Sequence, residues 1–398
     1  MILKETLRDI IRLQVDELKK MPIGIPRTQL ATIDLDSSFI IILSGIRRCG
    51  KSTLLRQLMN KTKCFYYFNF EDPRAINFEV TDFNKLEQVF HEELGECPYY
   101  FFDEIQNVPE WERFVRRLHD AGKQVFITGS NASLLSRELG NRLTGRHLSY
   151  EIFPFSFHEM LSLTKKKHSA DSLQNYLELG GFPEYLKSGN IQILHQLFRD
   201  IIVRDIVTRY QIRDYRVLME MAIYLMTNTG NEFSYNRLKN QFGLGSVNTV
   251  ISYLSYLEDS YLFFTVPKFS FSYAKHRAFS KKIYTVDPGL IGANTASLTP
   301  DLGRLLENAV FLHLKKQVND IFYYRNNSEC DFLVKEKGKI KRVIQVCYQL
   351  NDDNVKREIK GIKDAIKTTG ATEGVIVTLN QKDEIEGIPV LPAWEFIE

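Results

Sequence analysis

The stretch "GIRRCGKST" at residues 45–53 constrains the fold of this chain more than any other segment. It has the spacing G-x-x-x-x-G-K-[ST], in which glycines let the backbone curl so that successive N–H groups point at phosphate oxygens. The apolar run "SFIIILS" precedes it and "STLLRQLMN" follows, so we expect a buried strand, a loop and a helix whose N-terminus favours anions. This order predicts an α/β domain that binds the phosphates of a nucleotide.

Two side chains of this loop have expected roles of their own. Lys51 would supply a cation for the β- and γ-phosphates, and the hydroxyl of Ser52 would be placed to ligate Mg²⁺. We expect the whole loop to contact the nucleotide, namely Gly45, Ile46, Arg47, Arg48, Cys49, Gly50, Lys51, Ser52 and Thr53.

A pair of carboxylates follows a second apolar strand in "YYFFDEIQNV". Asp103 stands at the tip of that strand, where it would hold the Mg²⁺ shell. Glu104 is a second carboxylate, able to orient and deprotonate an attacking water molecule. Such a pair can also merely cap a strand, but after a phosphate loop we interpret it as part of a hydrolytic site.

A third strand, "QVFIT", ends in three residues that could contact the γ-phosphate or the water: Gly129, Ser130 and Asn131. We take Asn131 as the catalytic candidate. With strands expected at residues 63–73 and 146–155, strands alternate with helices, as in a doubly wound parallel sheet that binds ligands at the carboxyl ends of its strands.

The same residues resemble the AAA-plus group of P-loop ATPases, and more closely a group of predicted bacterial and archaeal ATPases. The shared phrases are "NFEDPR", "FDEIQ", "TGSN", "ELGNRLTGR" and "PFSFHE". The resemblance is strong over roughly the first half of the chain and looser beyond. It implies ATP and Mg²⁺ as ligands, with Walker B carboxylates at Asp103 and Glu104. The absence of an N-K-x-D signature for guanine agrees with adenine.

Three arginines, Arg137, Arg142 and Arg146, lie beyond the third strand, where related ATPases place an arginine finger. Such a finger stabilises charge on the transferred phosphoryl group. We take Arg146 as the catalytic candidate, with Arg142 second; the alternative is that these residues form surface ion pairs. A finger acting on a neighbouring copy would require a homo-oligomer.

Beyond the core (residues 1–155) we expect a helical lid at residues 156–212 and a winged-helix domain at 213–295. The third helix of the latter would bury Val247, Val250, Ile251, Leu254 and Leu257, and would expose Asn248, Thr249, Ser252 and Tyr256. The helix lacks basic residues, but the expected wing has Lys268, Lys275, His276, Arg277, Lys281 and Lys282. DNA is therefore a candidate partner, through its phosphates more than its bases.

Residues 300–398 resemble the PD-(D/E)xK nuclease core, which the same ATPase group commonly carries as a tail. Glu307 and Asp331 match the metal-binding acids of that fold. Gln345 and Cys347 stand where the fold has an acid and a lysine, so one negative charge and the catalytic ammonium are missing. We expect a degenerate domain that grips nucleic acid or protein without cleaving.

Composition adds few constraints. Lys plus Arg exceed Asp plus Glu by 52 to 49, a bias too weak to name a partner. Five cysteines without a CxxC pair favour a reducing compartment, and we expect a cytoplasmic protein without membrane spans. Our interpretation is an ATP-hydrolysing molecular switch. The alternatives are an ATP-gated DNA nuclease and an ATP-binding scaffold with little turnover.

Overall fold

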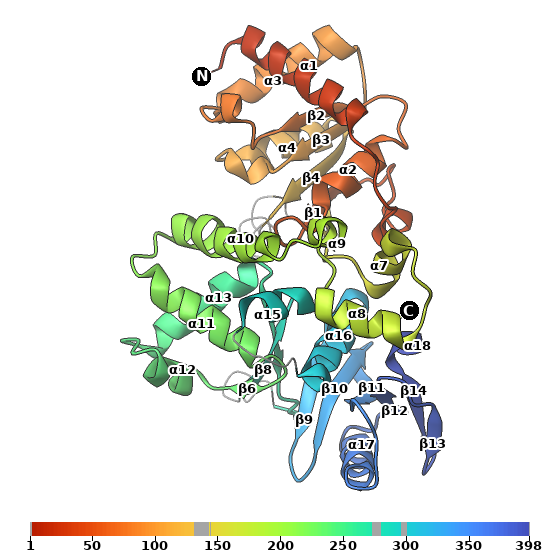
Figure 1. Cartoon of the computed structure of the whole chain (residues 1–398). Coiled ribbons are helices and arrows are strands. Elements are labelled where there is room, and N and C mark those ends of the chain that lie inside the picture. The colour runs from red at the N-terminus through yellow and green to blue at the C-terminus, as the bar shows by residue number, and fades with distance from the viewer. Residues whose placement is uncertain (1, 131–142, 144, 273–279, 296–300, 398) are drawn as a thin grey trace. The chain divides into compact units, whose positions relative to one another are not determined.

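The computed structural model describes residues 2–130, 143, 145–272, 280–295 and 301–397 (Figure 1). The chain divides into two compact units, Met1–Phe153 and Pro154–Glu398. The segments that we expected to form the lid, the winged helix and the nuclease-like tail all belong to the second unit. Their boundaries stay predictions.

The first unit is built on a five-stranded parallel sheet with the strand order β2-β3-β4-β1-β5. Its strands are β1 (Ile40–Ser44), β2 (Tyr66–Asn69), β3 (Tyr99–Asp103), β4 (Gln124–Gly129) and β5 (His147–Glu151). Because the strands are parallel, the loops after β1, β3 and β4 emerge at the same edge of the sheet. The predicted P-loop α/β fold is confirmed.

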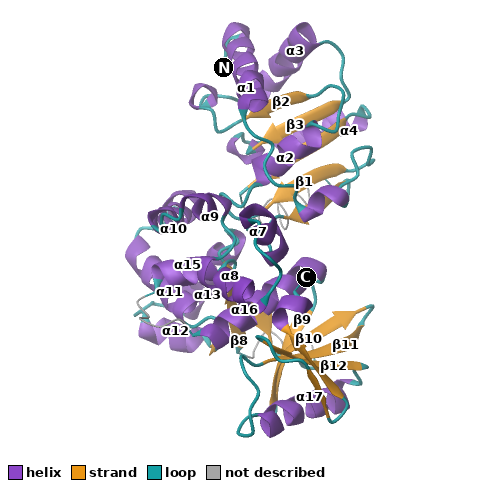
Figure 2. Cartoon of the chain, turned by 45° about the vertical axis from the view of Figure 1, so that its right-hand side comes forward, coloured by secondary structure: helices purple, strands orange, loops and turns teal. Residues whose placement is uncertain are grey.

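Helices cover both faces of this sheet (Figure 2). One face carries α1 (Lys4–Lys20), α3 (Phe83–Leu94) and α4 (Trp111–Asp120), which share one apolar core with alternate residues of the strands. In α1 the buried side chains Leu7, Ile10 and Ile11 recur at helical spacing, which is why this amphipathic segment docks. Helix α2 (Lys51–Met59) packs against β1, β3 and β4 from the other side. Short 3₁₀ turns lie at Thr28–Ala31, Pro73–Ala75, Val80–Asp82 and Ile105–Asn107.

Two of the five cysteines are bonded in the structure. Cys64, just before β2, forms a disulfide with Cys97, just before β3. The sequence did not predict this pair, because nothing in its spacing brings the two residues together. The expectation of a reducing compartment thereby loses its support from the cysteines, and the cytoplasmic location stays a prediction.

The second unit begins with helices α7 (Phe157–Thr164), α8 (Ala170–Leu179), α9 (Pro183–Ser188) and α10 (Gln192–Asp200), followed by a π-helix (Ile201–Thr208). The turn "GGF" between α8 and α9 packs on α15 (Pro288–Asn294) through Asp287, the N-cap residue of α15. The Asp287 carboxylate accepts the N–H of Gly181 at 2.6 Å and that of Leu290 at 3.2 Å. Burial raises the pKa of Asp287 to about 7. An added Cβ on Gly180 would lie 2.1 Å from this carboxylate, so the close approach requires glycine.

A helical cluster with a small sheet follows. It consists of α11 (Tyr215–Thr227), β6 (Glu232–Phe233), α12 (Tyr235–Gln241), α13 (Val247–Asp259), β7 (Phe263–Pro267) and β8 (Lys281–Thr285). The strands pair antiparallel in the order β6-β8-β7. In α13, Val250, Leu254 and Leu257 are buried as expected, whereas Ile251 is 44% exposed. The prediction for Ile251 was wrong because it lies on the flank of the helix, one position from the buried stripe.

The chain ends in a six-stranded mixed sheet with the order β13-β14-β12-β11-β10-β9. Its strands are β9 (Ile321–Arg325), β10 (Glu329–Glu336), β11 (Lys339–Val346), β12 (Glu373–Thr378), β13 (Asp383–Ile385) and β14 (Ile388–Pro392). Helices α16 (Leu302–Gln317) and α17 (Val355–Thr369) lie on opposite faces of the sheet, and α18 (Ala393–Phe396) closes the chain (Figure 1). Among the described helices, none has the length and the apolar character needed to cross a membrane.

Candidate nucleotide site

The loop between β1 and α2 is held against the segment that follows β5. Gly45 adopts φ 156°, and a Cβ added there would lie 2.0 Å from the carbonyl oxygen of Ile152. Only glycine allows this approach. Gly50 adopts φ 103° just before the first residue of α2, so the loop turns directly into a helix N-terminus. The sequence thus forms the strand, loop and helix that we predicted.

Lys51 points into the curve of this loop. Its ammonium donates to the carbonyl oxygens of Gly45 at 2.9 Å and Ile46 at 3.1 Å, and the residue is 4% exposed. It also lies 3.8 Å from a carboxylate oxygen of Glu104. A buried cation at the N-terminus of a helix is a favourable position for phosphate oxygens.

Asp103 lies at the end of β3 within the same group of side chains. It is 2% exposed, and its carboxylate accepts hydrogen bonds from the hydroxyls of Thr128 and, at 3.3 Å, Tyr67. The Ser52 hydroxyl lies near the same carboxylate. Burial and then the neighbouring charge of Glu104 raise the pKa of Asp103. Hydroxyl and carboxylate oxygens are the ligands that Mg²⁺ prefers, so this donor set fits the expected metal ion.

Glu104 is held in a specific orientation. Its backbone has φ 52°, an uncommon conformation for a residue other than glycine, and such strain is concentrated at functional sites. Its N–H donates to the Thr128 hydroxyl at 3.0 Å, and its carboxylate accepts from Ser130 at 3.2 Å and from the Gln106 amide. The carboxylate therefore points to the edge of the sheet where the phosphate loop lies.

Two contributors to this arrangement were not predicted from the sequence. Arg27 is 3% exposed and donates to the carbonyl oxygens of Cys49 and Phe153, each at 2.7 Å, so it ties the loop to the segment after β5. Tyr67 is the second, through its hydroxyl on Asp103. No motif marks Arg27. Tyr67 lies on β2, which pairs with β3, and its place in the strand expected before Asp103 was a usable signal.

The residue predicted to be the arginine finger, Arg146, does not lie with the other predicted site residues. Arg146 lies at the beginning of β5, level with the beginning of β1, and its guanidinium is 3.7 Å from Asp120. The length of β5, about 13 Å for four steps of about 3.3 Å, separates it from the loop edge. Arg146 therefore cannot reach a nucleotide on its own chain, and this part of the prediction was wrong. Its action on a neighbouring copy stays a prediction. Asn131, Arg137 and Arg142 lie outside the described residues.

The two arginines of the phosphate loop, Arg47 and Arg48, do not join the group around Lys51. Arg47 forms an ion pair with Glu71 at 3.2 Å, and Arg48 adopts φ 63°. Cys49 is fully buried, and this burial raises the pKa of its thiol, so it packs as an apolar side chain.

In the second unit the structure brings together the four residues that we compared with a nuclease site. Glu307 on α16, Asp331 on β10 and Gln345 on β11 are all largely buried, and Gln345 accepts the N–H of Asp331 at 3.3 Å. Cys347 follows directly after β11, and burial raises the pKa of its thiol. A fifth residue, Lys282, occupies the centre of the group.

Lys282 was predicted to be a basic residue of an exposed wing, and this prediction was wrong. It is 3% exposed, and its ammonium lies 2.8 Å from Asp331 and 3.1 Å from Glu307. Burial alone would lower the pKa of Lys282, but Asp331, Tyr284 and Glu307 outweigh it and raise the pKa well above its ordinary value. Lys282 and Tyr284 alternate along β8 and point to the side of Glu307 and Asp331. The sequence alone did not indicate which residues of the expected wing would face inward.

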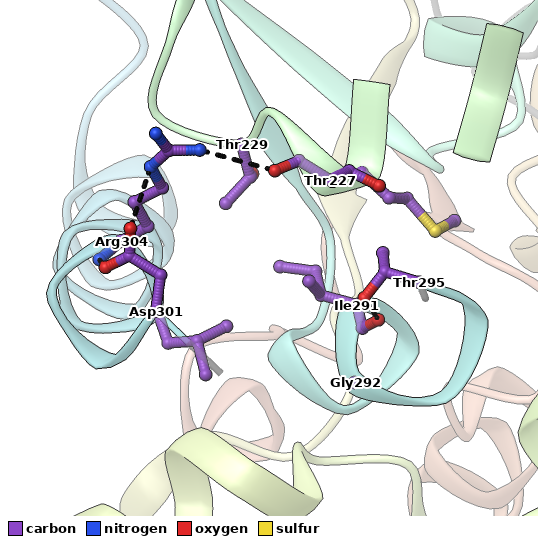
Figure 3. Close-up of a pocket in the computed structure, with 9 residues that line it drawn as sticks. Thr227, Thr229, Ile291, Gly292, Thr295, Asp301 and Arg304 are labelled. Atoms are coloured by element: carbon purple, nitrogen blue, oxygen red, sulfur yellow. Dashed lines mark hydrogen bonds and ion pairs between the residues drawn. The ribbon is translucent and has the colours of Figure 1, made fainter. Parts of the chain in front are cut away.

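A separate cavity of about 310 Å³ lies between α11, α15 and α16 (Figure 3). Its polar groups bond to one another: Arg304 lies 3.0 Å from Asp301 and donates to the Thr227 carbonyl at 3.4 Å. The hydroxyl of Thr229 donates to Asn308 at 3.2 Å. We assign no ligand to this cavity.

Comparison with family models divides the chain into three matched segments. Residues 37–161 match an AAA domain, which contains every described residue of the candidate site except Arg27. Residues 170–300 match a domain of unknown function (DUF8612), and residues 302–396 match another (DUF4143). The first unit is therefore an AAA-type domain.

Whole-chain relatives are also found. The chain is 36% identical over 404 residues to the uncharacterized protein MJ1544 of Methanocaldococcus jannaschii, covering 92% of this chain and 89% of the relative. It is 29% identical over 385 residues to an uncharacterized protein of Haemophilus influenzae, covering 89% and 93%. The chain belongs to the same family as the archaeal protein MJ1544, and this family likeness extends over both units.

Among solved structures, AMPPCP-bound DnaA from Aquifex aeolicus is similar at 15% identity. The match covers 63% of this chain and 88% of that one, with a TM-score of 0.30. A similarity with this TM-score carries no information about function.

Proposed function

We propose that this protein binds and hydrolyses Mg-ATP at the edge of the parallel sheet and acts as a molecular switch. One observation carries the proposal: Lys51 and Ser52 at the start of α2 form a single connected group with Asp103 and Glu104 at the end of β3. Their chemistry is complementary, because a cation, a hydroxyl and two carboxylates are what phosphoryl transfer requires.

Each side chain has a distinct part in this proposal. The backbone N–H groups of the loop and the Lys51 ammonium bind and orient the phosphates. Ser52 and Asp103 would hold Mg²⁺, which supplies charge neutralisation at the phosphates when bound. Glu104 orients the attacking water and accepts its proton, while Ser130 and Gln106 keep its carboxylate in place. Thr128 and Tyr67 fix the position of Asp103.

The first test is nucleotide binding by calorimetry. Replacement of Lys51 by alanine is expected to weaken ATP binding about 10- to 100-fold, because it removes a charge-assisted contact to the phosphates. Lys63→Ala, an exposed lysine before β2, is the matched control and should bind as the unaltered chain does. Equal affinity of the Lys51→Ala chain and the unaltered chain would remove the proposal. A scaffold that binds ATP with little turnover would also bind ATP more weakly after Lys51→Ala, but substitution of Glu104 would not lower its phosphate release.

Nucleic acid is the second candidate ligand. We propose that residues 213–295 form a winged-helix domain, supported by the order α11–β6–α12–α13–β7–β8 and its three-stranded antiparallel sheet. Arg213 lines an open hollow of about 480 Å³ with Ser246, Asn248 and Thr249 at the first turn of α13. An arginine beside hydroxyl and amide groups at a helix N-terminus suits a phosphate of the nucleic-acid backbone.

Binding of duplex DNA to the full chain is expected to weaken at least about tenfold between 50 and 200 mM salt, because released counterions favour the free state at higher salt. Arg213→Ala should weaken binding uniformly across sequences and flatten the salt dependence. Lys187→Ala, on the exposed side of α9, is the control. Fluorescence anisotropy measures both effects. No binding at low salt would remove DNA as a partner and leave the ATPase proposal intact.

A further inference from the structure

We propose that Lys282 is the permanent cation of the acidic site formed by Glu307 and Asp331, so that this site takes up no divalent metal ion and cleaves no nucleic acid. The proposal is independent of the ATPase function. It concerns the second unit alone. In this proposal the nuclease-like group of side chains is an internal ion-pair contact, called the clasp, in which Lys282 on β8 binds Glu307 on α16 and Asp331 on β10.

The first step is the position of the ammonium. Its nitrogen lies 2.8 Å from Asp331 Oδ1, 3.1 Å from Glu307 Oε1 and 3.3 Å from Glu329 Oε1. The Lys282 side chain is 4% exposed, so solvent does not compete for these contacts. The ammonium therefore stands between the two acids that would have to share a metal ion, and a second cation there would lie next to a buried positive charge.

The second step is that further donors already bond to the carboxylates of this group. Asp331 Oδ2 accepts the N–H of Val346 at 3.0 Å, and Glu307 Oε1 also accepts the Tyr284 hydroxyl at 2.6 Å. Gln345 is neutral, and its oxygen accepts the N–H of Asp331. Across the part of the chain that the structure describes, no group of three or more His, Cys, Asp and Glu side chains is arranged to hold a metal ion.

The third step is the connection that Lys282 makes. It lies on β8 of the three-stranded sheet, whereas Glu307 lies on α16 and Asp331 on β10 of the six-stranded sheet. The adjacent Asn308 adds two bonds between α16 and β8, through the N–H of Thr285 at 2.9 Å and its carbonyl at 3.0 Å. The ammonium thus fastens two sheets at a point where carboxylates would otherwise repel each other.

The test uses the full chain carrying Asp103→Asn, which removes the Mg²⁺ carboxylate of the nucleotide site, and no nucleotide is added. Lys282→Met on this background should lower the melting temperature of the second unit by about 10 °C, because breaking a buried ion pair leaves uncompensated charge. Mn²⁺ should restore much of this loss relative to EDTA, since it can replace the missing cation. Lys281→Met, the neighbouring residue on β8, is the matched control and should show neither effect.

Two measurements without the Lys282 variant keep the proposal testable if that variant does not fold. The Asp103→Asn chain should bind no Mn²⁺ stoichiometrically by electron paramagnetic resonance, and the unaltered chain should not nick plasmid DNA with Mn²⁺, with or without ATP. Mn²⁺ binding that disappears in Asp331→Asn would overturn the proposal. So would nicking that disappears in Asp331→Asn, since Lys282 would then serve an active site. A Lys282→Met chain that melts at the same temperature as the Asp103→Asn chain from which it was made would exclude this role of Lys282.

Discussion

Replacement of Glu104 by glutamine is expected to lower the rate of ATP hydrolysis about 10²- to 10⁴-fold while ATP still binds. Glutamine keeps the size of the side chain and its contact with Ser130 but cannot accept a proton from water. The contribution lies in the chemical step, so kcat should fall and the affinity for ATP should change little. Phosphate release under saturating Mg-ATP and calorimetry of ATP binding measure the two quantities on the same preparations.

Glu110 provides a control for the Glu104 substitution. It also adopts a left-handed backbone, with φ 59°, but it is the N-cap residue of α4 and pairs with Arg113 at 3.4 Å. Glu110→Gln should leave turnover within about twofold of the unaltered chain, since exposed ion pairs contribute little. If Glu104→Gln hydrolyses ATP as fast as Glu110→Gln, Glu104 is not the base. If neither the variant nor the unaltered chain turns over, the protein is an ATP-binding scaffold.

The sequence predicted the parts of the fold that are local in the chain. The loop at residues 45–53 and its flanking strand and helix follow from glycine spacing and apolar runs, which depend only on near neighbours. The five parallel strands and the gathering of Asp103 and Glu104 beside Lys51 follow as well. Parallel topology sends successive carboxyl ends to one edge, so order along the chain translates into proximity.

The sequence did not predict contacts between residues far apart in the chain. Arg27 reaches Phe153 across the first unit, and Lys282 reaches Asp331 from another sheet. Both are charged side chains that are buried because carbonyl groups or carboxylates satisfy them, whereas a charged residue is by default expected at the surface. The predicted place of Arg146 was wrong for a related reason. Because Arg146 follows β4 in the sequence, we expected it at the edge of the sheet where the phosphate loop lies, but it directly precedes β5 and so lies at the opposite edge.

Replacement of Gly45 by alanine is expected to destabilise the first unit by at least about 3 kcal/mol and to weaken ATP binding at least about tenfold. The added Cβ would lie 2.0 Å from the carbonyl oxygen of Ile152 and 2.9 Å from its carbonyl carbon, and both are backbone atoms that no rotamer change can move. Ile152 is itself held by its N–H on the Ser44 carbonyl. Relief of the overlap therefore requires β1 or the segment after β5 to shift, and Lys51 would shift with the loop.

Gly95→Ala separates this steric effect from the cost of backbone conformation. Gly95 has φ 71° and ends α3, but an added Cβ there would meet no atom within 4 Å. Its substitution should cost only the backbone term, about 1–3 kcal/mol for a conformation that is essentially restricted to glycine, and leave ATP affinity unchanged. Urea unfolding and calorimetry on both variants give the comparison. Equal destabilisation by the two substitutions would mean that the loop does not need its contact with Ile152, and a stable Gly45→Ala chain that binds ATP normally would show that phosphates are bound elsewhere.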